Sequence, residues 1–154
     1  MKKTNLSQLT TLAIISSLSI ILGIYIQIKT PTGFLTLLDA GIFFTAFYFG
    51  SKEGAIVGGL SGFLIDLILG YPNWMVISLF AHGGQGFFAG WAGQKRGVGL
   101  IFATITMVGG YFLASNAMYG YAAASADIYG NLLQNMVGMA VGFSVSQALK
   151  RLKK

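Results

Sequence analysis

Six apolar runs, separated by short breaks rich in glycine, proline and charged residues, follow one another along the chain. They span 9–28, 34–49, 54–69, 74–92, 98–119 and 128–149. A helix needs about 20 apolar residues to cross the hydrocarbon of a bilayer, and somewhat fewer suffice when it ends in a buried loop. The pattern predicts an all-α integral membrane protein, a bundle of six transmembrane helices forming a single domain over 1–154. The second and third runs have only 16 residues each, which leaves a re-entrant pair as an alternative.

Composition supports a membrane protein and disfavours several other classes. The 154 residues are 55% hydrophobic and 9% charged, with 22 glycines and no cysteine, whereas globular chains carry about 25% charge. So few charged side chains cannot cover a water-facing surface. Soluble enzymes, disordered regions, disulfide scaffolds and cysteine-based metal centres are therefore disfavoured. A single histidine gives no cluster with metal-ligand spacing, so neither a metal nor a cofactor is expected.

The basic residues indicate how the chain lies in the membrane. With six spans, Lys29 falls on one side, and the other lysines and arginines share the opposite side: Lys2, Lys3, Lys52, Lys95, Arg96, Lys150, Arg151, Lys153 and Lys154. The positive-inside rule then places both termini in the cytoplasm. The first apolar run is long for a signal peptide and has no small-x-small cleavage site, so it is predicted to remain as a helix. A multi-pass protein of the bacterial plasma membrane is expected.

Strongly polar side chains within the runs gather in the outer half of the membrane. Asp39 and Asp66 lie roughly 8 and 5 Å below the outer ends of their helices at 1.5 Å per residue. The other members of the set are His82 and Gln85, spaced i, i+3, and Asn116, Asn131, Gln134 and Asn135. A pore needs polar lining along its whole length, whereas a capture site needs it only where the solute stops. The distribution predicts a solute-binding pocket, closed below by small and apolar residues.

Several of these residues also have a purely structural interpretation. His82 could be an interior histidine bonded to a neighbouring carbonyl, although Gln85 beside it favours a pair that faces a ligand. Tyr71 and Trp74, which flank Pro72-Asn73, could be interfacial aromatics or an aromatic wall for a bound ring. The glycine spacings at 54, 58 and 62, at 86 and 90, and at 138 and 142 predict close helix packing.

Motifs that carry chemistry are scarce. No Walker loop is present, so the chain cannot hydrolyse ATP itself. Gly59-Leu60-Ser61-Gly62 is similar to the Gly-x-Ser-Gly motif of rhomboid intramembrane proteases, and Ser61 and His82 lie at similar depths, so a serine–histidine dyad is one alternative. His82 is on the very next helix, however, whereas rhomboids place another span between nucleophile and base. A structural membrane protein, whose polar residues only join helices, is a second alternative.

A longer resemblance begins at the second run. Leu38-Asp39-Ala40 and the stretches 49–58, 66–74 and 82–90 resemble the substrate-binding S components of energy-coupling factor (ECF) vitamin transporters, in particular the hydroxymethylpyrimidine and pyridoxine branch. The Gly-Tyr-Pro and His-Gly elements are the most specific. The resemblance implies a six-helix bundle that binds a vitamin in its outer half, under a lid formed by the first loop, where Pro31, Gly33 and threonines have a suitable composition. It also implies a transmembrane coupling subunit and two ATPase subunits as partners.

The family commonly presents Ala-xxx-Ala on the first helix to the coupling subunit, and this chain has Ala13-xxx-Ser17 at that place. Lys29 is the only basic residue expected on the outer side, so vitamins with a carboxylate are less favoured. A neutral or cationic ring such as pyridoxine, hydroxymethylpyrimidine or thiamine suits the polar set better. The predicted substrate-binding residues are Asp39, Asp66, Tyr71, Asn73, Trp74, His82, Gln85, Asn116, Asn131 and Asn135.

Overall fold

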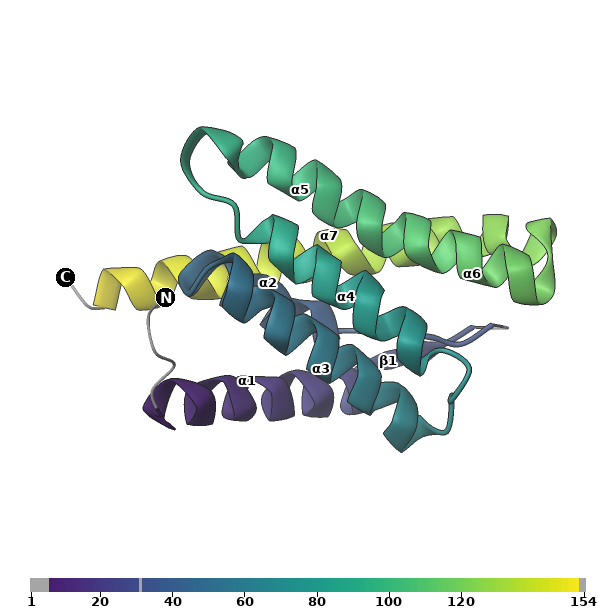
Figure 1. Cartoon of the computed structure of the whole chain (residues 1–154), viewed down its shortest axis with the longest axis horizontal. Coiled ribbons are helices and arrows are strands. Elements are labelled where there is room, and N and C mark those ends of the chain that lie inside the picture. The colour runs from purple at the N-terminus through teal and green to yellow at the C-terminus, as the bar shows by residue number, and fades with distance from the viewer. Residues whose placement is uncertain (1–5, 31, 153–154) are drawn as a thin grey trace.

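The computed structural model describes residues 6–30 and 32–152, and its long helices form one bundle (Figure 1). Pro31 of the predicted lid and the basic residues Lys2, Lys3, Lys153 and Lys154 lie outside the described residues. The elements are α1 (Leu6–Tyr25), β1 (Gln27–Lys29), β2 (Phe34–Thr36), α2 (Leu38–Tyr48), α3 (Ser51–Leu69), α4 (Met75–Ala89), η1 (Gly93–Lys95), α5 (Arg96–Thr104), η2 (Ile105–Gly109), α6 (Gly110–Tyr119) and α7 (Tyr121–Leu152). Because η1, α5, η2 and α6 make one continuous helix, the described chain has the six helical spans that the sequence predicts.

A short β-hairpin replaces the helix ends expected between the first two runs. α1 ends at Tyr25, and β1 pairs with β2 antiparallel, with Gln27 opposite Thr36 and Lys29 opposite Phe34. The β-branched Ile26 and Ile28 alternate here with polar residues, a pattern that suits a strand better than a helix. As a result α2 begins only at Leu38 and has 11 residues.

The last helix is much longer than its apolar run. α7 has 32 residues and begins at Tyr121, so most of the small-residue stretch 120–127, expected as a loop, is helical. Alanine is the best helix former and fills 122–124, whereas the only interruption is Gly120, whose φ of 89° ends α6. The extra turns bring Asp127 and Asn131 to the end of the bundle that carries the hairpin.

Two helix pairs meet through glycine. A Cβ placed on Gly54, Gly58 or Gly62 of α3 would overlap backbone carbonyl oxygens of α4. On α7, a Cβ on Gly138 or Gly142 would overlap Asp39 or Phe43 of α2. The predicted glycine packing is therefore present at both interfaces, and it holds α2 at the centre of the bundle, where it packs against α1, α3, α4 and α7.

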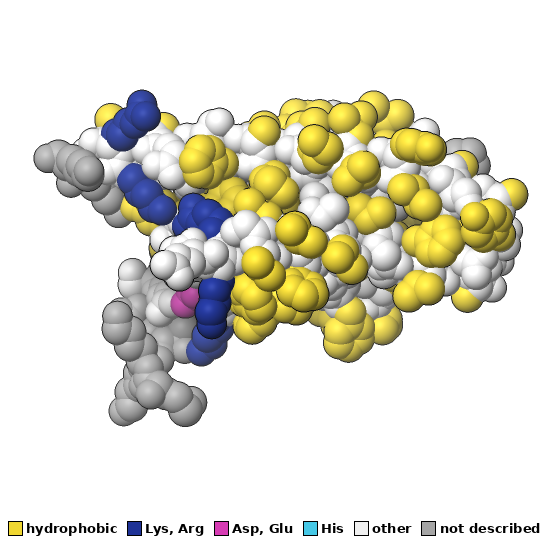
Figure 2. Space-filling model, turned by 90° about the horizontal axis from the view of Figure 1, so that it is seen from above, with side chains coloured by type: hydrophobic (Ala, Val, Ile, Leu, Met, Phe, Trp, Pro, Cys, Tyr) yellow, Lys and Arg dark blue, Asp and Glu magenta, His cyan; other side chains and the backbone are white. Residues whose placement is uncertain are grey.

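The two ends of the bundle differ in charge. The start of α1 and the end of α7 lie at one end (Figure 1), and Lys and Arg side chains gather at that end, with apolar side chains over the rest of the visible face (Figure 2). The described basic residues apart from Lys29 are Lys52, Lys95, Arg96, Lys150 and Arg151. Helix α1 and the continuous helix Gly93–Tyr119 are long and apolar enough to cross a membrane, by length and composition.

Candidate functional site

A cavity of about 170 Å³ lies beside the hairpin. Figure 1 shows the end of the bundle at which this hairpin lies. The hairpin, the last turn of α3, the first turns of α4 and parts of α6 and α7 surround it. Its polar lining comes from Thr30, Thr32, Thr36, Asp66, His82, Asp127, Asn131 and Gln134, and its aromatic lining from Phe34, Trp74 and Tyr111. None of the lysines and arginines in the described part of the chain lines this cavity.

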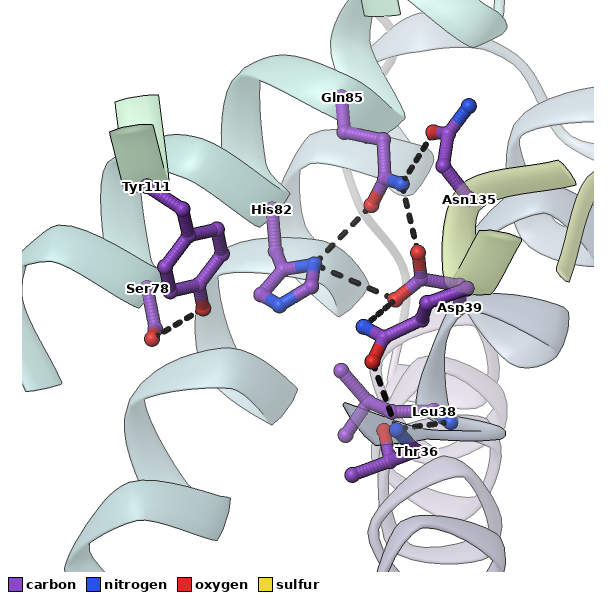
Figure 3. A network of polar contacts seen from close by, with 9 residues as sticks. Thr36, Leu38, Asp39, Ser78, His82, Gln85, Tyr111 and Asn135 are labelled. Atoms are coloured by element: carbon purple, nitrogen blue, oxygen red, sulfur yellow. Dashed lines mark hydrogen bonds and ion pairs between the residues drawn. The ribbon is translucent and has the colours of Figure 1, made fainter. Parts of the chain in front are cut away.

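His82 stands between the cavity and a fully buried polar network (Figure 3). Its Nδ1 lies 3.0 Å from Oε1 of Gln85 and 3.4 Å from Oδ1 of Asp39. Gln85 Nε2 donates hydrogen bonds of 2.8 Å to Asp39 Oδ2 and to Asn135 Oδ1. Asp39, Gln85 and Asn135 are each 0% exposed, so the network lies behind the cavity wall and fixes the histidine from within the bundle.

The network has two outer connections. Asn135 Nδ2 donates to the Thr104 hydroxyl at 2.8 Å, where α5 passes into η2. On the other side, Gln134 Nε2 donates to Asp39 Oδ1 at 3.1 Å, and Gln134 Oε1 accepts the backbone N–H of Thr36 at 2.6 Å. The network therefore joins α2, α4, α5, α7 and the second strand of the hairpin.

Asp66 is the second carboxylate at the cavity wall. The Gly70 cap (φ 80°) ends α3 just after it: the backbone N–H groups of Gly70 and Tyr71 both donate to the Asp66 carbonyl. The Asp66 side chain is 4% exposed, and its Oδ2 makes no hydrogen bond within the described chain. Beside it, the hydroxyls of Ser78 and Tyr111 bond to each other. A buried carboxylate oxygen without a partner is costly, so this atom is a natural acceptor for a ligand.

Hydrogen bonds hold the hairpin over the cavity. Trp74 Nε1 donates to the Thr32 carbonyl at 3.0 Å. The Thr32 hydroxyl lies 2.7 and 2.8 Å from the two carboxylate oxygens of Asp127, which also accepts from Ser115 at 2.9 Å. These contacts agree with the covering role that the composition of this loop predicts.

The structure sorts the predicted site residues into three groups. Asp66, Trp74, His82 and Asn131 line the cavity, whereas Asp39, Gln85 and Asn135 form the network behind it. Tyr71, Asn73 and Asn116 do not line it: Tyr71 packs on Phe34 with ring centroids 5.0 Å apart, and Asn73 and Asn116 are exposed. Asn116 points outward because its neighbour Ser115 is the residue that this turn of the helix buries.

Some lining residues were not among those predicted. Tyr111 lies between Trp74 and His82, with ring centroids 5.5 and 5.6 Å away. It sits in an apolar run just after the π-helical turn η2, so neither composition nor ordinary helical spacing indicates where it faces. Thr36 and Asp127 belong to segments expected as helix start and loop. Gln134 follows Asn131 by three residues, so the two share one face of a helix. That spacing could have indicated Gln134 as a lining residue.

The predicted docking residues Ala13 and Ser17 are both exposed on α1. The Ser17 hydroxyl donates to the Ala13 carbonyl at 2.9 Å, within its own helix. The Ser61–His82 dyad of the protease alternative is not formed as a hydrogen bond. Ser61 Oγ is buried without a partner in the described chain, and His82 Nδ1 faces Gln85 and Asp39.

An apolar helical bundle with a polar, aromatic-walled cavity at one end is a membrane protein suited to binding a small solute. Comparison with known proteins agrees with this class. Residues 3–151 match the family described as ECF-type riboflavin transporter, S component. The chain therefore belongs to the S-component family of ECF-type transporters, as the sequence resemblance implies. It is a substrate-binding component and a multi-pass protein of the cell membrane, and its family is one of transporters, not of enzymes.

Individual relatives cover nearly all of the chain. It is 39% identical, over 98% of its own length and 92% of the relative, to the thiamine precursor transporter HmpT of Lactococcus lactis subsp. cremoris. It is 30% identical, over 82% of its length and 88% of the relative, to an uncharacterized protein of Pyrococcus woesei. The solved S component of a bacterial ECF transporter shares 21% identity and a TM-score of 0.74 over 95% of this chain and 96% of that chain. That likeness shows the fold.

Proposed function

We propose that this S component captures a small, neutral or cationic heteroaromatic vitamin or precursor, with hydroxymethylpyrimidine as the best candidate. The observation that carries the proposal is the buried Asp66 oxygen at the cavity wall, which has no hydrogen-bond partner in the described chain. Asp127 adds a second carboxylate to the lining, and no lysine or arginine of the described residues accompanies them. Such a cavity favours a ligand that donates hydrogen bonds and disfavours one that carries a carboxylate.

The size and walls of the cavity support a single ring. Its volume of about 170 Å³ is below the roughly 300–1,000 Å³ of pockets that hold drug-sized ligands. Trp74 and Tyr111 offer aromatic faces on which a flat ring can stack. The 39% identity to a thiamine precursor transporter favours a pyrimidine over pyridoxine, and the volume favours it over the two-ring thiamine.

Tryptophan fluorescence of the detergent-purified protein tests the proposal. Trp74 lines the cavity, whereas Trp91 packs on Phe88 and Phe102 near the basic end. Titration with hydroxymethylpyrimidine, pyridoxine and thiamine is expected to give a saturable signal with the pyrimidine at the lowest concentration. The Trp74→Phe variant should lose that signal, and the matched Trp91→Phe variant should keep it. A response that disappears with Trp91→Phe instead, or no response in folded protein, would contradict the proposed site.

The proposal includes the orientation and the partners of the family. The basic end, with Lys52, Lys95 and Arg96, faces the cytoplasm, which places the cavity at the outer side of the membrane. The exposed α1 face with Ala13 and Ser17 docks on a transmembrane coupling subunit, which two ATPase subunits drive. Small side chains on a lipid-facing helix support this assignment, because they let another helix approach closely.

Uptake measurements test the need for these partners. The sequence has no Walker loop, so the chain alone can bind or equilibrate a solute but has no energy source to concentrate it. Cells that express only this chain, in a host without coupling subunits or another carrier for the vitamin, should show no uphill accumulation. Co-expression with a coupling subunit and its ATPases should produce it. Accumulation without them would argue against the proposed partnership.

A further inference from the structure

The two ring nitrogens of His82 face different surroundings. Nδ1 faces the buried network, 3.0 Å from Gln85 Oε1 and 3.4 Å from Asp39 Oδ1. The other nitrogen, Nε2, points away from that pair toward the space beside Tyr111 and Leu38, which both line the cavity (Figure 3). Which nitrogen carries the proton therefore decides whether the histidine offers the cavity a donor or an acceptor.

One chain of hydrogen bonds fixes the orientation of Gln85. It starts at the Leu100 carbonyl, which can only accept, and which receives the Thr104 hydroxyl at 2.9 Å. The oxygen of Thr104 is then left to accept Asn135 Nδ2, which turns Asn135 Oδ1 toward Gln85 Nε2. With its nitrogen so engaged, Gln85 must present Oε1 to His82.

A second chain fixes Asp39 as an acceptor. It starts at the backbone N–H of Thr36, which can only donate, and which bonds to Gln134 Oε1. Gln134 must then turn Nε2 toward Asp39 Oδ1, and Gln85 Nε2 donates to Asp39 Oδ2. Both oxygens of Asp39 therefore accept hydrogen bonds, as in an ionised carboxylate.

Both chains end at His82 Nδ1, which faces two acceptors and must carry the proton. The ring has little freedom to turn over, because Tyr111 packs on it and Gly62 lies close to its other edge. The gap at Gly62 is so small that even a Cβ there would lie 2.8 Å from Cδ2 of His82. We propose that Asp39 and Gln85 hold the proton of His82 on Nδ1, so that Nε2 and the free Asp66 oxygen together select a ligand that carries an amino group on its ring. The proposal rests on the proposed function, and it makes Asp39 and Gln85 positioning residues rather than ligand contacts.

Nitrogen NMR of the ligand-free protein reads the proton position directly. The chain contains a single histidine, so labelling histidine with ¹⁵N gives signals from one ring only. The expected spectrum at neutral pH shows a protonated Nδ1 and an unprotonated Nε2. A proton on Nε2, alone or together with one on Nδ1, would overturn the proposal, and this outcome does not depend on any ligand.

A matched pair of ligands tests the selectivity. Hydroxymethylpyrimidine should bind at least about tenfold more tightly than the analogue in which a methyl group replaces its ring amine, because the analogue leaves two buried acceptors without a donor. Asp39→Asn should reduce that ratio and move the nitrogen signals, since an amide can turn a donor toward Nδ1.

The outcomes separate the two proposals. Equal binding of the two pyrimidines, or a ratio that Asp39→Asn leaves unchanged in folded protein, would overturn the selectivity mechanism while leaving vitamin capture in place. Absence of saturable binding by either pyrimidine would instead count against the proposed function, and with it against the selectivity that rests on it, whatever proton position the spectrum shows.

Discussion

Asp66 is the single residue whose substitution separates ligand binding from stability most clearly. Its Oδ2 has no partner among the described residues, so removing the charge breaks no hydrogen bond at that oxygen. A carboxylate acceptor contributes about 1.5–3 kcal/mol in a charge-assisted hydrogen bond. Asp66→Asn is therefore expected to weaken hydroxymethylpyrimidine binding about tenfold or more, as measured by calorimetry, with a much smaller effect on thermal stability.

The control is a residue that the sequence places in the pocket and the structure does not. Asn116 is exposed and lies outside the cavity lining, so Asn116→Ala should leave the affinity unchanged. A loss of affinity in Asn116→Ala that equals the loss in Asp66→Asn would show that the cavity has been assigned to the wrong side chains.

At the scale of the elements, the contact between α3 and α4 depends on glycine. A Cβ at Gly58 would overlap the backbone carbonyl of His82, which cannot move without shifting the helix. Gly58→Ala is expected to destabilise the protein by about 1–3 kcal/mol through overpacking, seen as a lower midpoint of thermal unfolding in detergent. It should also weaken vitamin binding, because His82 moves with its backbone.

Gly97 provides the matched control for this substitution. It is exposed on α5, and a Cβ there would meet nothing within 4 Å. Gly97→Ala should therefore be neutral or slightly stabilising, by up to about 1 kcal/mol. If Gly58→Ala proves as harmless as Gly97→Ala, the α3–α4 interface is not as close as described.

The elements also show what the sequence could and could not predict. Hydrophobic run length indicates helices well, because burial in lipid demands long apolar segments whatever their neighbours. Segment ends are harder to predict: Gln27–Lys29 forms a strand only because Phe34–Thr36 is available to pair with it. The stretch after Gly120 lacks a strong apolar pattern, and its alanines become helix by propensity and by packing against α6.

The sequence indicated which part of each helix carries the polar side chains, but not the direction in which each side chain points. Asp39, Gln85 and Asn135 lie near the cavity, yet they point into the network and not into the cavity. Spacing along one helix cannot distinguish these two environments, because both are polar and buried. Tyr111 follows the π-helical turn Ile105–Gly109, which rotates later residues relative to an ordinary helix.

At the scale of the whole molecule, the asymmetry of the bundle accounts for its role. One end carries the cavity, the hairpin and the aspartates Asp66 and Asp127, and the other carries Glu53 and most of the described basic residues, which gather at one end of the face in Figure 2. Between them, glycine contacts between α2 and α7 and between α3 and α4 bring the helices close together. A cavity at one end, above close-packed helices, suits a component that captures a solute and depends on partners for its transfer.

Equilibrium dialysis of the purified protein against labelled hydroxymethylpyrimidine tests the central claim most directly. It measures capture without partner subunits, without a fluorescent reporter and without assuming which side chain responds. The account predicts saturable binding of one molecule per chain, displaced by unlabelled hydroxymethylpyrimidine and little affected by vitamins that carry a carboxylate. Binding that fails to saturate in folded protein, or that a carboxylate vitamin displaces more readily than the pyrimidine itself, would contradict it.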